Sequence, residues 1–307
     1  MEGVCGWLAR MEICWHWMRL VAMKGKRNMF NWLLEPLAYP FMVRGLAAAI
    51  LVGIVCAVVG TYVVLRGMAF FGDALAHTVL PGVALGYLVS GGAREPLFWW
   101  ALGTAVLASL GIGAISRNSH IKEDTAIGII FAGMFALGIA LISTVRSYAV
   151  DLSHFLFGDV LGVTNRDLWL TAIFGGIVLV VIIVFYKEFL TLSFDPVLAM
   201  TLRMPVGLLN NVLLTMIAVT VAVSMQTVGV ALMVAMLVTP AATAYLLTRR
   251  LWMMMIVAAV IGASSSVIGL YLSYYLNIAS GAAIVLTATA VFGTVFVVKP
   301  RQRGLKM

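Results

Sequence analysis

The sequence predicts an all-α, polytopic membrane protein built as a bundle of about nine transmembrane helices. Hydrophobic residues make up 63% of the 307 residues and charged residues only 10%, whereas a soluble domain has roughly 25% charged residues. Several uncharged runs reach the roughly 20 residues that a helix needs to cross a bilayer core. The alternating polar and apolar pattern of an outer-membrane barrel is absent, so we expect the backbone to satisfy its hydrogen bonds within helices.

The positions of the apolar runs predict nine transmembrane spans. Two runs, 206–248 and 251–298, are longer than one helix. We divide them at QTVG (226–229) and NIASG (277–281), where glycine and polar residues are typical of turns. The predicted spans are 41–65, 70–89, 97–116, 125–146, 168–186, 208–225, 228–247, 251–276 and 281–298.

The connections between these spans form two alternating sets that differ strongly in positive charge. The poor set holds only Arg94, Arg146 and Arg166. By the positive-inside rule the rich set is cytoplasmic, which places the C-terminus inside and the start of the first span outside. Topology thus explains the net charge of +8, and we expect no nucleic-acid partner. The rich set comprises Arg66, Arg117, Lys122, Lys187, Arg203, Arg249, Arg250, Lys299, Arg301, Arg303 and Lys306.

The first thirty residues do not fit this orientation, because their basic residues favour the cytoplasm. The segment is too charged for a span, and its Trp and Met residues favour an amphipathic helix at the membrane interface. It also lacks the cleavage site of a signal peptide. Alternatively, translation begins at Met29. We therefore expect an N-terminal extension at 1–30, a transmembrane domain at 31–303 and a cytoplasmic tail at 304–307. The basic residues are Arg10, Arg19, Lys24, Lys26 and Arg27.

The second span contains an aspartate and a histidine near its middle. At 1.5 Å per residue from Arg66, Asp73 lies about 10 Å and His77 about 16 Å along the helix. Four residues apart, they share one helical face. Ionisable groups at this depth usually face a polar cavity and mark a functional site. A carboxylate and an imidazole suit a divalent metal ion; the alternative is a pair that bonds to a neighbouring helix only for structural reasons.

Two ligands are too few for a four- to six-coordinate ion. A two-fold dimer whose axis passes this helical face would bring together two Asp73 and two His77 side chains. Pro81 and Gly82, one turn later, weaken the helix and would allow it to bend.

The other histidines and the cysteines are weaker candidates. His16 lies in the extension and His120 in a cytoplasmic loop, while His154 lies in the outer connection 149–167. That connection also contains three aspartates. A metal-entry site or outer gate is one interpretation and a solvated loop is the other. The aspartates are Asp151, Asp159 and Asp167, and the cysteines, which show no metal-ligand spacing, are Cys5, Cys14 and Cys56.

The cytoplasmic segment 187–210 predicts a short helix at its centre. Asp195 is a suitable N-cap and Pro196 a suitable first helical residue, and Met204-Pro205 then closes the segment. Its apolar residues exceed what a solvated loop needs. They indicate either a helix that docks into a partner groove or a helix that rests at the lipid interface. The apolar residues are Val197, Leu198, Met200 and Leu202.

Six blocks in a fixed order, spread over roughly residues 33 to 303, resemble one known family. The blocks are VVLRGMAFFGDALAHTVLPGVALGYL, EDTAIGIIFAGMFALGIALIS, HFLFGDVLGV, FDPVLAMTLRMPV, MQTVGVALMVAMLVTPAATAYLLTRR and GLYLSYYLNIASGAAIVL. The family comprises the membrane permease subunits of ABC-type manganese, zinc and iron importers.

This resemblance implies a permease of the vitamin B12 and metal-chelate importer type in the bacterial plasma membrane. It implies a non-catalytic homodimer in the lipid bilayer, an extracytoplasmic metal-binding protein, two cytoplasmic ABC ATPase subunits and no permanent cofactor. Asp73 and His77 align with the family's metal pair, whereas Ala76 departs from the common serine. Residues of about 195–209 align with the coupling helix, whose expected ATPase contacts are Phe194, Asp195, Pro196, Ala199, Leu202, Met204 and Pro205.

The transported metal and two other functions stay open. Aspartate and histidine ligands suit manganese, iron(II) or zinc, and affinity alone favours zinc, but YYLNIASGAAIVLTATA is similar to manganese-type members. A secondary transporter driven by an ion gradient is an alternative, and the absence of a GxxxxGK[ST] motif fits it and a permease subunit equally. An intramembrane aspartyl protease needs two facing carboxylates, which FFGDA and LFGDV do not provide, because Asp159 lies in an outer connection. HExxH and GxSxG are absent.

Overall fold

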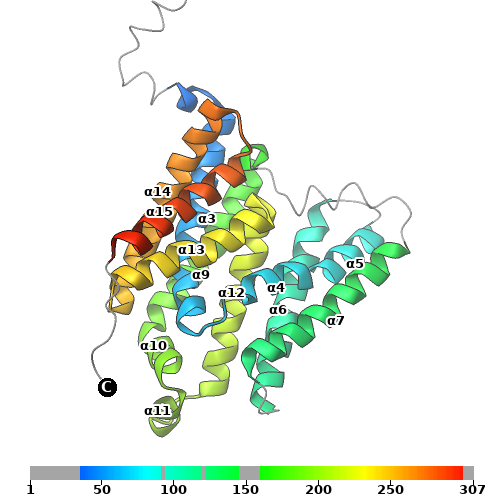
Figure 1. Ribbon diagram of the computed structural model, residues 1–307. Helices are drawn as coiled ribbons and strands as arrows, with labels where there is room; N and C mark the ends of the chain where they lie inside the picture. The colour runs from blue at the N-terminus through cyan, green and yellow to red at the C-terminus, as the bar shows by residue number, and fades with distance from the viewer. Residues whose placement is uncertain (1–34, 91–93, 119–121, 145–159, 300–307) are drawn as a thin grey trace, which may run out of the picture. The chain divides into compact units, whose positions relative to one another are not determined.

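The computed structural model describes residues 35–90, 94–118, 122–144 and 160–299 (Figure 1). The chain forms two compact units, Met1–Val43 and Arg44–Met307. In the first unit the described part consists of the 3-10 helix η1 (Pro36–Ala38) and the first residues of α3 (Pro40–Leu65). Several predictions lie outside the described residues: the extension 1–30, the tail 304–307, and those for Cys5, Cys14, His16, His120, Asp151, His154 and Asp159.

The nine predicted spans are confirmed within the described part of the chain, with boundaries shifted by a few residues. The second span is interrupted once and consists of α4 and α5. Three short elements lie between the spans: η2 (Val160–Gly162), α10 (Tyr186–Phe194) and α11 (Pro196–Thr201). The spanning helices are α3, α4 (Phe71–Thr78) with α5 (Leu80–Ser90), α6 (Arg94–Asn118), α7 (Glu123–Ser143), α9 (Asn165–Val184), α12 (Val206–Val228), α13 (Val230–Leu247), α14 (Leu251–Leu276) and α15 (Ser280–Val298).

Both predicted breaks in the long apolar runs are confirmed. Gly229 separates α12 from α13 with a φ angle of 85°, a region that costs glycine little because it has no Cβ. Asn277 ends α14 in the left-handed conformation with a φ angle of 53°, and asparagine tolerates this region better than most residues. The polar and glycine residues therefore do mark the turns.

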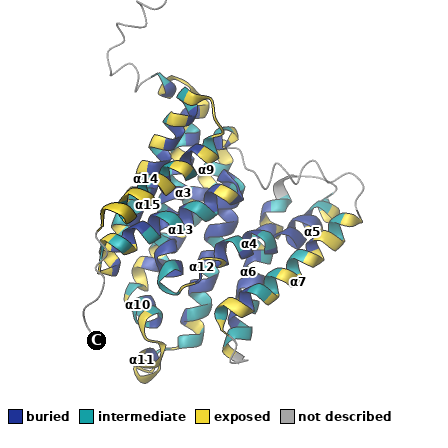
Figure 2. Ribbon diagram, viewed as in Figure 1, coloured by how far each residue is buried: buried dark blue, intermediate teal, exposed yellow. Residues whose placement is uncertain are grey.

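Helix α12 lies at the centre of the second unit. It contacts α4, α6, α9 and α13, and many of its residues are buried. Helices α4 to α7 pack together on one side of it, and α13 to α15 pack together on another (Figure 1). By contrast, α7 and α15 are largely exposed (Figure 2). Exposed apolar helices in this arrangement face lipid or another membrane protein.

Small residues allow α3 and α14 to cross closely. A Cβ built on Gly262 would lie 2.6 Å from the carbonyl oxygen of Gly53. Near this crossing the Ser266 hydroxyl donates a hydrogen bond of 2.9 Å to the carbonyl of Ala49. Between helices in lipid, such close packing and hydrogen bonding replace the hydrophobic driving force. Cys56 of α3 is also buried, and its thiol donates to the hydroxyl of Ser224, as expected of a packing residue.

We predict that Gly262→Ala destabilises the protein by about 1–3 kcal/mol, because the added methyl group pushes two backbones apart. The matched control is Gly176→Ala, since a Cβ on Gly176 meets no atom within 4 Å. This control should leave stability unchanged or raise it slightly, because alanine favours helix. Thermal unfolding of both purified variants in detergent measures the difference. Equal melting temperatures would contradict a close crossing at Gly262.

Candidate metal site and coupling segment

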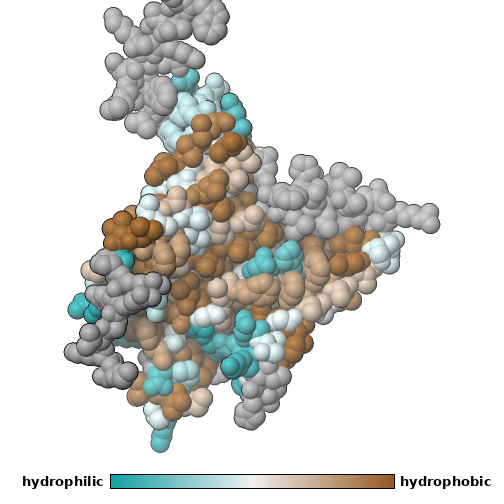
Figure 3. All heavy atoms as spheres, in the orientation of Figure 1, coloured by the Kyte–Doolittle hydropathy of each residue, from teal (hydrophilic) through white to brown (hydrophobic). Residues whose placement is uncertain are grey.

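Helix α4 buries all of its residues except the predicted metal pair. The side chains of Asp73 and His77 are 37% and 29% exposed, whereas the other residues of α4 are buried. Figure 3 shows the result as a small hydrophilic patch over α4, surrounded by hydrophobic residues. The helix therefore presents one polar strip, made by these two side chains alone.

The distance between the two side chains suits a shared ion better than a direct bond. His77 Nε2 lies 3.8 Å from Asp73 Oδ1, which is too long for a hydrogen bond. Nitrogen and oxygen ligands lie about 2.0–2.2 Å from a zinc ion and about 3.4 Å from each other in a tetrahedral site, so a small side-chain movement would bring both atoms within reach of one ion. Among the described residues no third His, Cys, Asp or Glu joins the pair. The described part of one chain thus offers two candidate ligands at this place.

Two phenylalanines of α7 hold the imidazole of His77. Its ring packs edge-on against Phe131 and Phe135, with centroids 5.9 and 5.6 Å away, a favourable geometry for aromatic pairs. His77 Nδ1 is buried and has no hydrogen-bond partner within the described chain. The other ring nitrogen, Nε2, is the one that lies beside Asp73, so it is the atom that would face a cation shared by the two side chains.

The chain is interrupted directly after the pair. Pro81 has no N–H to donate to the carbonyl of His77 four residues earlier, so α4 ends at Thr78 and α5 begins at Leu80. The interruption is packed tightly, because a Cβ on Gly138 of α7 would lie only 2.8 Å from Leu80 Cβ. This matches the weakness predicted at Pro81. Ala76 is buried and supplies no hydroxyl group to either ligand.

The N-cap predicted for the short helix in the segment 187–210 is confirmed. The Asp195 carboxylate accepts hydrogen bonds of 3.0 Å from the N–H groups of Val197 and Leu198, and Pro196 is the first residue of α11. The helix is shorter than the predicted segment 195–209. It ends at Thr201 because Arg203 adopts a left-handed φ angle of 56°. Pro205 follows and precedes α12, and the residue before a proline disfavours helix.

Helix α11 presents an apolar surface to its surroundings. Only Ala199 of this helix is buried, and Met204 N–H donates to its carbonyl. Contiguous exposed apolar side chains commonly mark a protein or membrane contact. Five apolar residues in and beside α11 are each between 48% and 68% exposed, and we name them together the α11 surface. They are Phe194, Val197, Leu198, Met200 and Leu202.

A polar cluster that the sequence did not indicate joins the α3–α4 connection to α7 and α12 at the end assigned to the cytoplasm. Arg66 Nη2 lies 2.8 Å from Glu123 Oε1 at the start of α7, and Asn210 Nδ2 of α12 donates to the same oxygen at 3.4 Å. Burial lowers the pKa of the Arg66 guanidinium, and the Glu123 carboxylate acts in the opposite direction. Arginine nevertheless stays protonated in proteins. The cluster links the segment that enters α4 to α7 and α12.

At the end of the bundle assigned to the outside, Asp167 has a structural role. Its carboxylate accepts from the backbone N–H of Thr164, whose hydroxyl accepts from the N–H of Asp167, and together they form a capping box at the start of α9. Gln226 of α12 donates to the same carboxylate at 3.4 Å. Asp167 is therefore engaged in helix capping. The remaining members of the predicted outer site lie outside the described residues.

Comparisons with known proteins agree with this architecture. The manganese transport system membrane protein MntC of Halalkalibacterium halodurans is 47% identical over 266 residues, which cover 87% of this chain and 90% of that protein. A probable iron transport system membrane protein of Haemophilus influenzae is 42% identical over 264 residues, which cover 86% of this chain and 96% of that protein. In the solved structure of PsaBC from Streptococcus pneumoniae in complex with Fab, one chain matches with a TM-score of 0.76 and 42% identity. The match covers 90% of this chain and 98% of that chain.

The model of the ABC 3 transport family matches residues 38–299, which include the second span, α11 and all the helices around them. The resemblance noted from the sequence blocks is thereby confirmed. The chain belongs to the ABC 3 transport family and is a multi-pass permease of the bacterial plasma membrane.

Proposed function

We propose that the chain is the membrane-spanning, non-catalytic permease subunit of an ATP-driven importer of divalent transition metal ions. The observation that supports this function best is the Asp73–His77 pair, left exposed on an otherwise buried helix within a transmembrane span. A carboxylate and an imidazole suit Mn²⁺, Fe²⁺ and Zn²⁺. Among these ions, the name of the Halalkalibacterium relative favours manganese.

Two copies of the chain form the translocation path in this proposal. One chain offers only two ligands among its described residues, whereas transition metal ions take four to six. A two-fold axis beside α4 would place a second Asp73 and His77 opposite the first pair. Two carboxylates would then balance the charge of one divalent ion, and water would fill the remaining positions.

The α11 surface would dock on a cytoplasmic ATPase subunit, while an extracytoplasmic binding protein would deliver the ion. Movement of α11 reaches α12 directly, because only four residues separate the two helices. Asn210 then passes the movement to Glu123 and Arg66. Arg66 precedes α4, so in this proposal the cluster connects the α11 surface with the Asp73–His77 pair. ATP binding and hydrolysis would thereby open the pair to one side of the membrane at a time.

We predict that Asp73→Asn and His77→Ala each abolish manganese uptake, because each removes one ligand from every copy. Assembly with the ATPase should survive, since both side chains are partly exposed and neither bonds to another described residue. Uptake of radioactive or fluorescently detected Mn²⁺ in cells, with competing zinc and iron, measures the effect. Asp124→Asn, which alters an exposed carboxylate at the start of α7, is the control. Normal uptake in both site variants would remove the assignment.

We predict that Met200→Asp prevents association with the ATPase, because it places a carboxylate in the apolar α11 surface. Arg250→Asp introduces the same group in another exposed connection at the same end of the bundle and should leave association intact. Co-purification of tagged chain with the ATPase measures both. Full ATPase association in Met200→Asp would contradict docking through the α11 surface, whereas uptake that persists without ATPase association would favour the alternative, a secondary transporter driven by an ion gradient.

We predict that Glu123→Gln lowers uptake about ten-fold while ATP hydrolysis continues, because the amide loses the charge-assisted bond to Arg66, which is worth roughly 1.5–3 kcal/mol. The double variant Arg66→Glu with Glu123→Arg restores opposite charges at the same two positions and should recover part of the uptake. Transport and hydrolysis are measured on the same reconstituted complex. A fall of both activities together would show that the cluster only stabilises the fold.

A further inference from the structure

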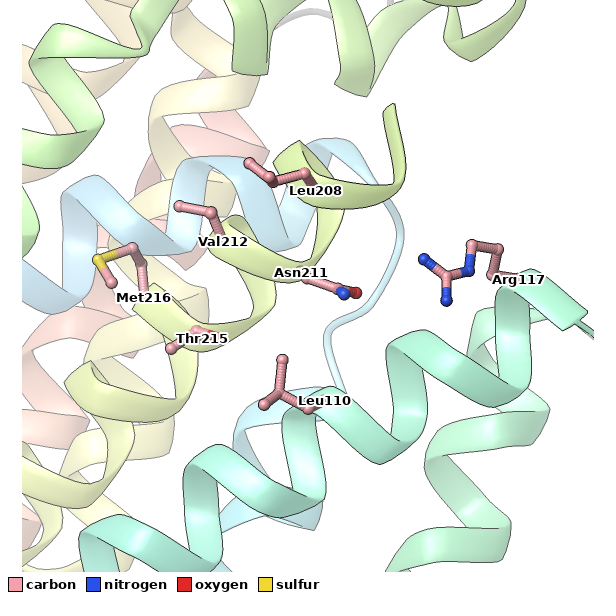
Figure 4. A pocket seen from close by; sticks show the side chains of 7 residues that line it. All are labelled: Leu110, Arg117, Leu208, Asn211, Val212, Thr215 and Met216. Atoms are coloured by element: carbon pink, nitrogen blue, oxygen red, sulfur yellow. The ribbon is translucent and has the colours of Figure 1, made fainter. Parts of the chain in front are cut away.

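A groove opens between α6 and α12, separate from the metal pair. Its volume is about 350 Å³ (Figure 4). Along α12 it extends from Leu208 to Met216, which is about 12 Å at 1.5 Å per residue. None of its residues belongs to α4, to the α11 surface or to the Arg66 cluster. The lining residues are Leu110, Arg117, Leu208, Asn211, Val212, Thr215 and Met216.

The groove is cationic at one end and apolar along its length. In Figure 4 the guanidinium of Arg117 extends from the end of α6 toward the side-chain amide of Asn211. Arg117 is exposed, and no carboxylate of the described chain forms an ion pair with it. Leu110, Val212 and Met216 line the rest. An anion with a long apolar tail is the ligand that complements this distribution.

The position of the groove in the bilayer further restricts the class of ligand that can bind there. Arg117 ends the membrane span Pro96–Arg117, so it lies at the depth of the lipid phosphates. It belongs to the basic set that the positive-inside rule assigns to the cytoplasm. From there the apolar lining leads into the hydrocarbon layer, where acyl chains lie. Basic pockets between helices on this side of a membrane suit anionic lipid headgroups.

We propose that this groove binds an anionic phospholipid of the cytoplasmic leaflet. Its phosphate lies against Arg117 and Asn211, and one acyl chain follows Leu110, Val212 and Met216. Such a lipid joins α6 to α12 close to the start of α12, which follows the α11 surface. The proposal depends on the position of the groove in the membrane and is independent of the transported metal.

The test uses the complete transporter, purified in mild detergent and incubated with phosphatidylglycerol. Native mass spectrometry counts the phospholipids retained on each complex. Arg117→Gln should weaken retention about five-fold, which corresponds to about 1 kcal/mol for one basic residue at an anionic surface. Arg117→Lys should retain the lipid, because a lysine also binds phosphate. Arg250→Gln removes an exposed cation from another connection at the same end and should have no effect.

Two results would overturn the proposal. One is equal retention of phosphatidylglycerol by the unchanged protein and by Arg117→Gln. The other is that a photo-crosslinker placed at position 208 or 215 reacts only with the ATPase and never with lipid. The groove would then be a protein interface. Crosslinks to lipid that Arg117→Gln reduces would support the lipid site. Because Arg117 and Arg250 are both exposed, we expect all three substitutions to leave the folding of the chain unchanged.

Discussion

The placement of Asp73 and His77 within a membrane span is the constraint on which the rest of this structure depends. A carboxylate or imidazole removed from water is costly unless another polar group or an ion replaces the lost hydration. Neither side chain bonds to another described residue, and the two are too far apart to bond each other. Their partner therefore lies outside the described residues. In the proposed dimer, a divalent cation and a second copy of α4 together would meet that requirement.

The surrounding fold keeps this polar strip in place while leaving one weak point beside it. Phe131 and Phe135 fix the imidazole, and the close approach of Gly138 to Leu80 fixes the start of α5. Pro81 interrupts the helix in between. The cluster of Arg66, Glu123 and Asn210 lies at the other end of α4 and bonds to α7 and α12.

Local sequence patterns sufficed for the spans, the two glycine- and asparagine-containing breaks, the Asp195 cap and the shared face of the metal pair. Each depends on residues within a few positions of one another. The cluster around Glu123 could not be foreseen, because Arg66 and Asn210 are 57 and 87 residues away from it. The same is true of the aromatic contacts to His77. The early end of α11 was missed because a left-handed arginine has no sequence signature.

The central claim is that one ion is shared by the metal pairs of two chains. Pulsed electron paramagnetic resonance of Mn²⁺ bound to the complete transporter, labelled with ¹⁵N-histidine, counts the imidazole nitrogens that coordinate the ion. Two nitrogens per ion, one from each copy of His77, are expected. A single nitrogen, or none, would contradict the shared site.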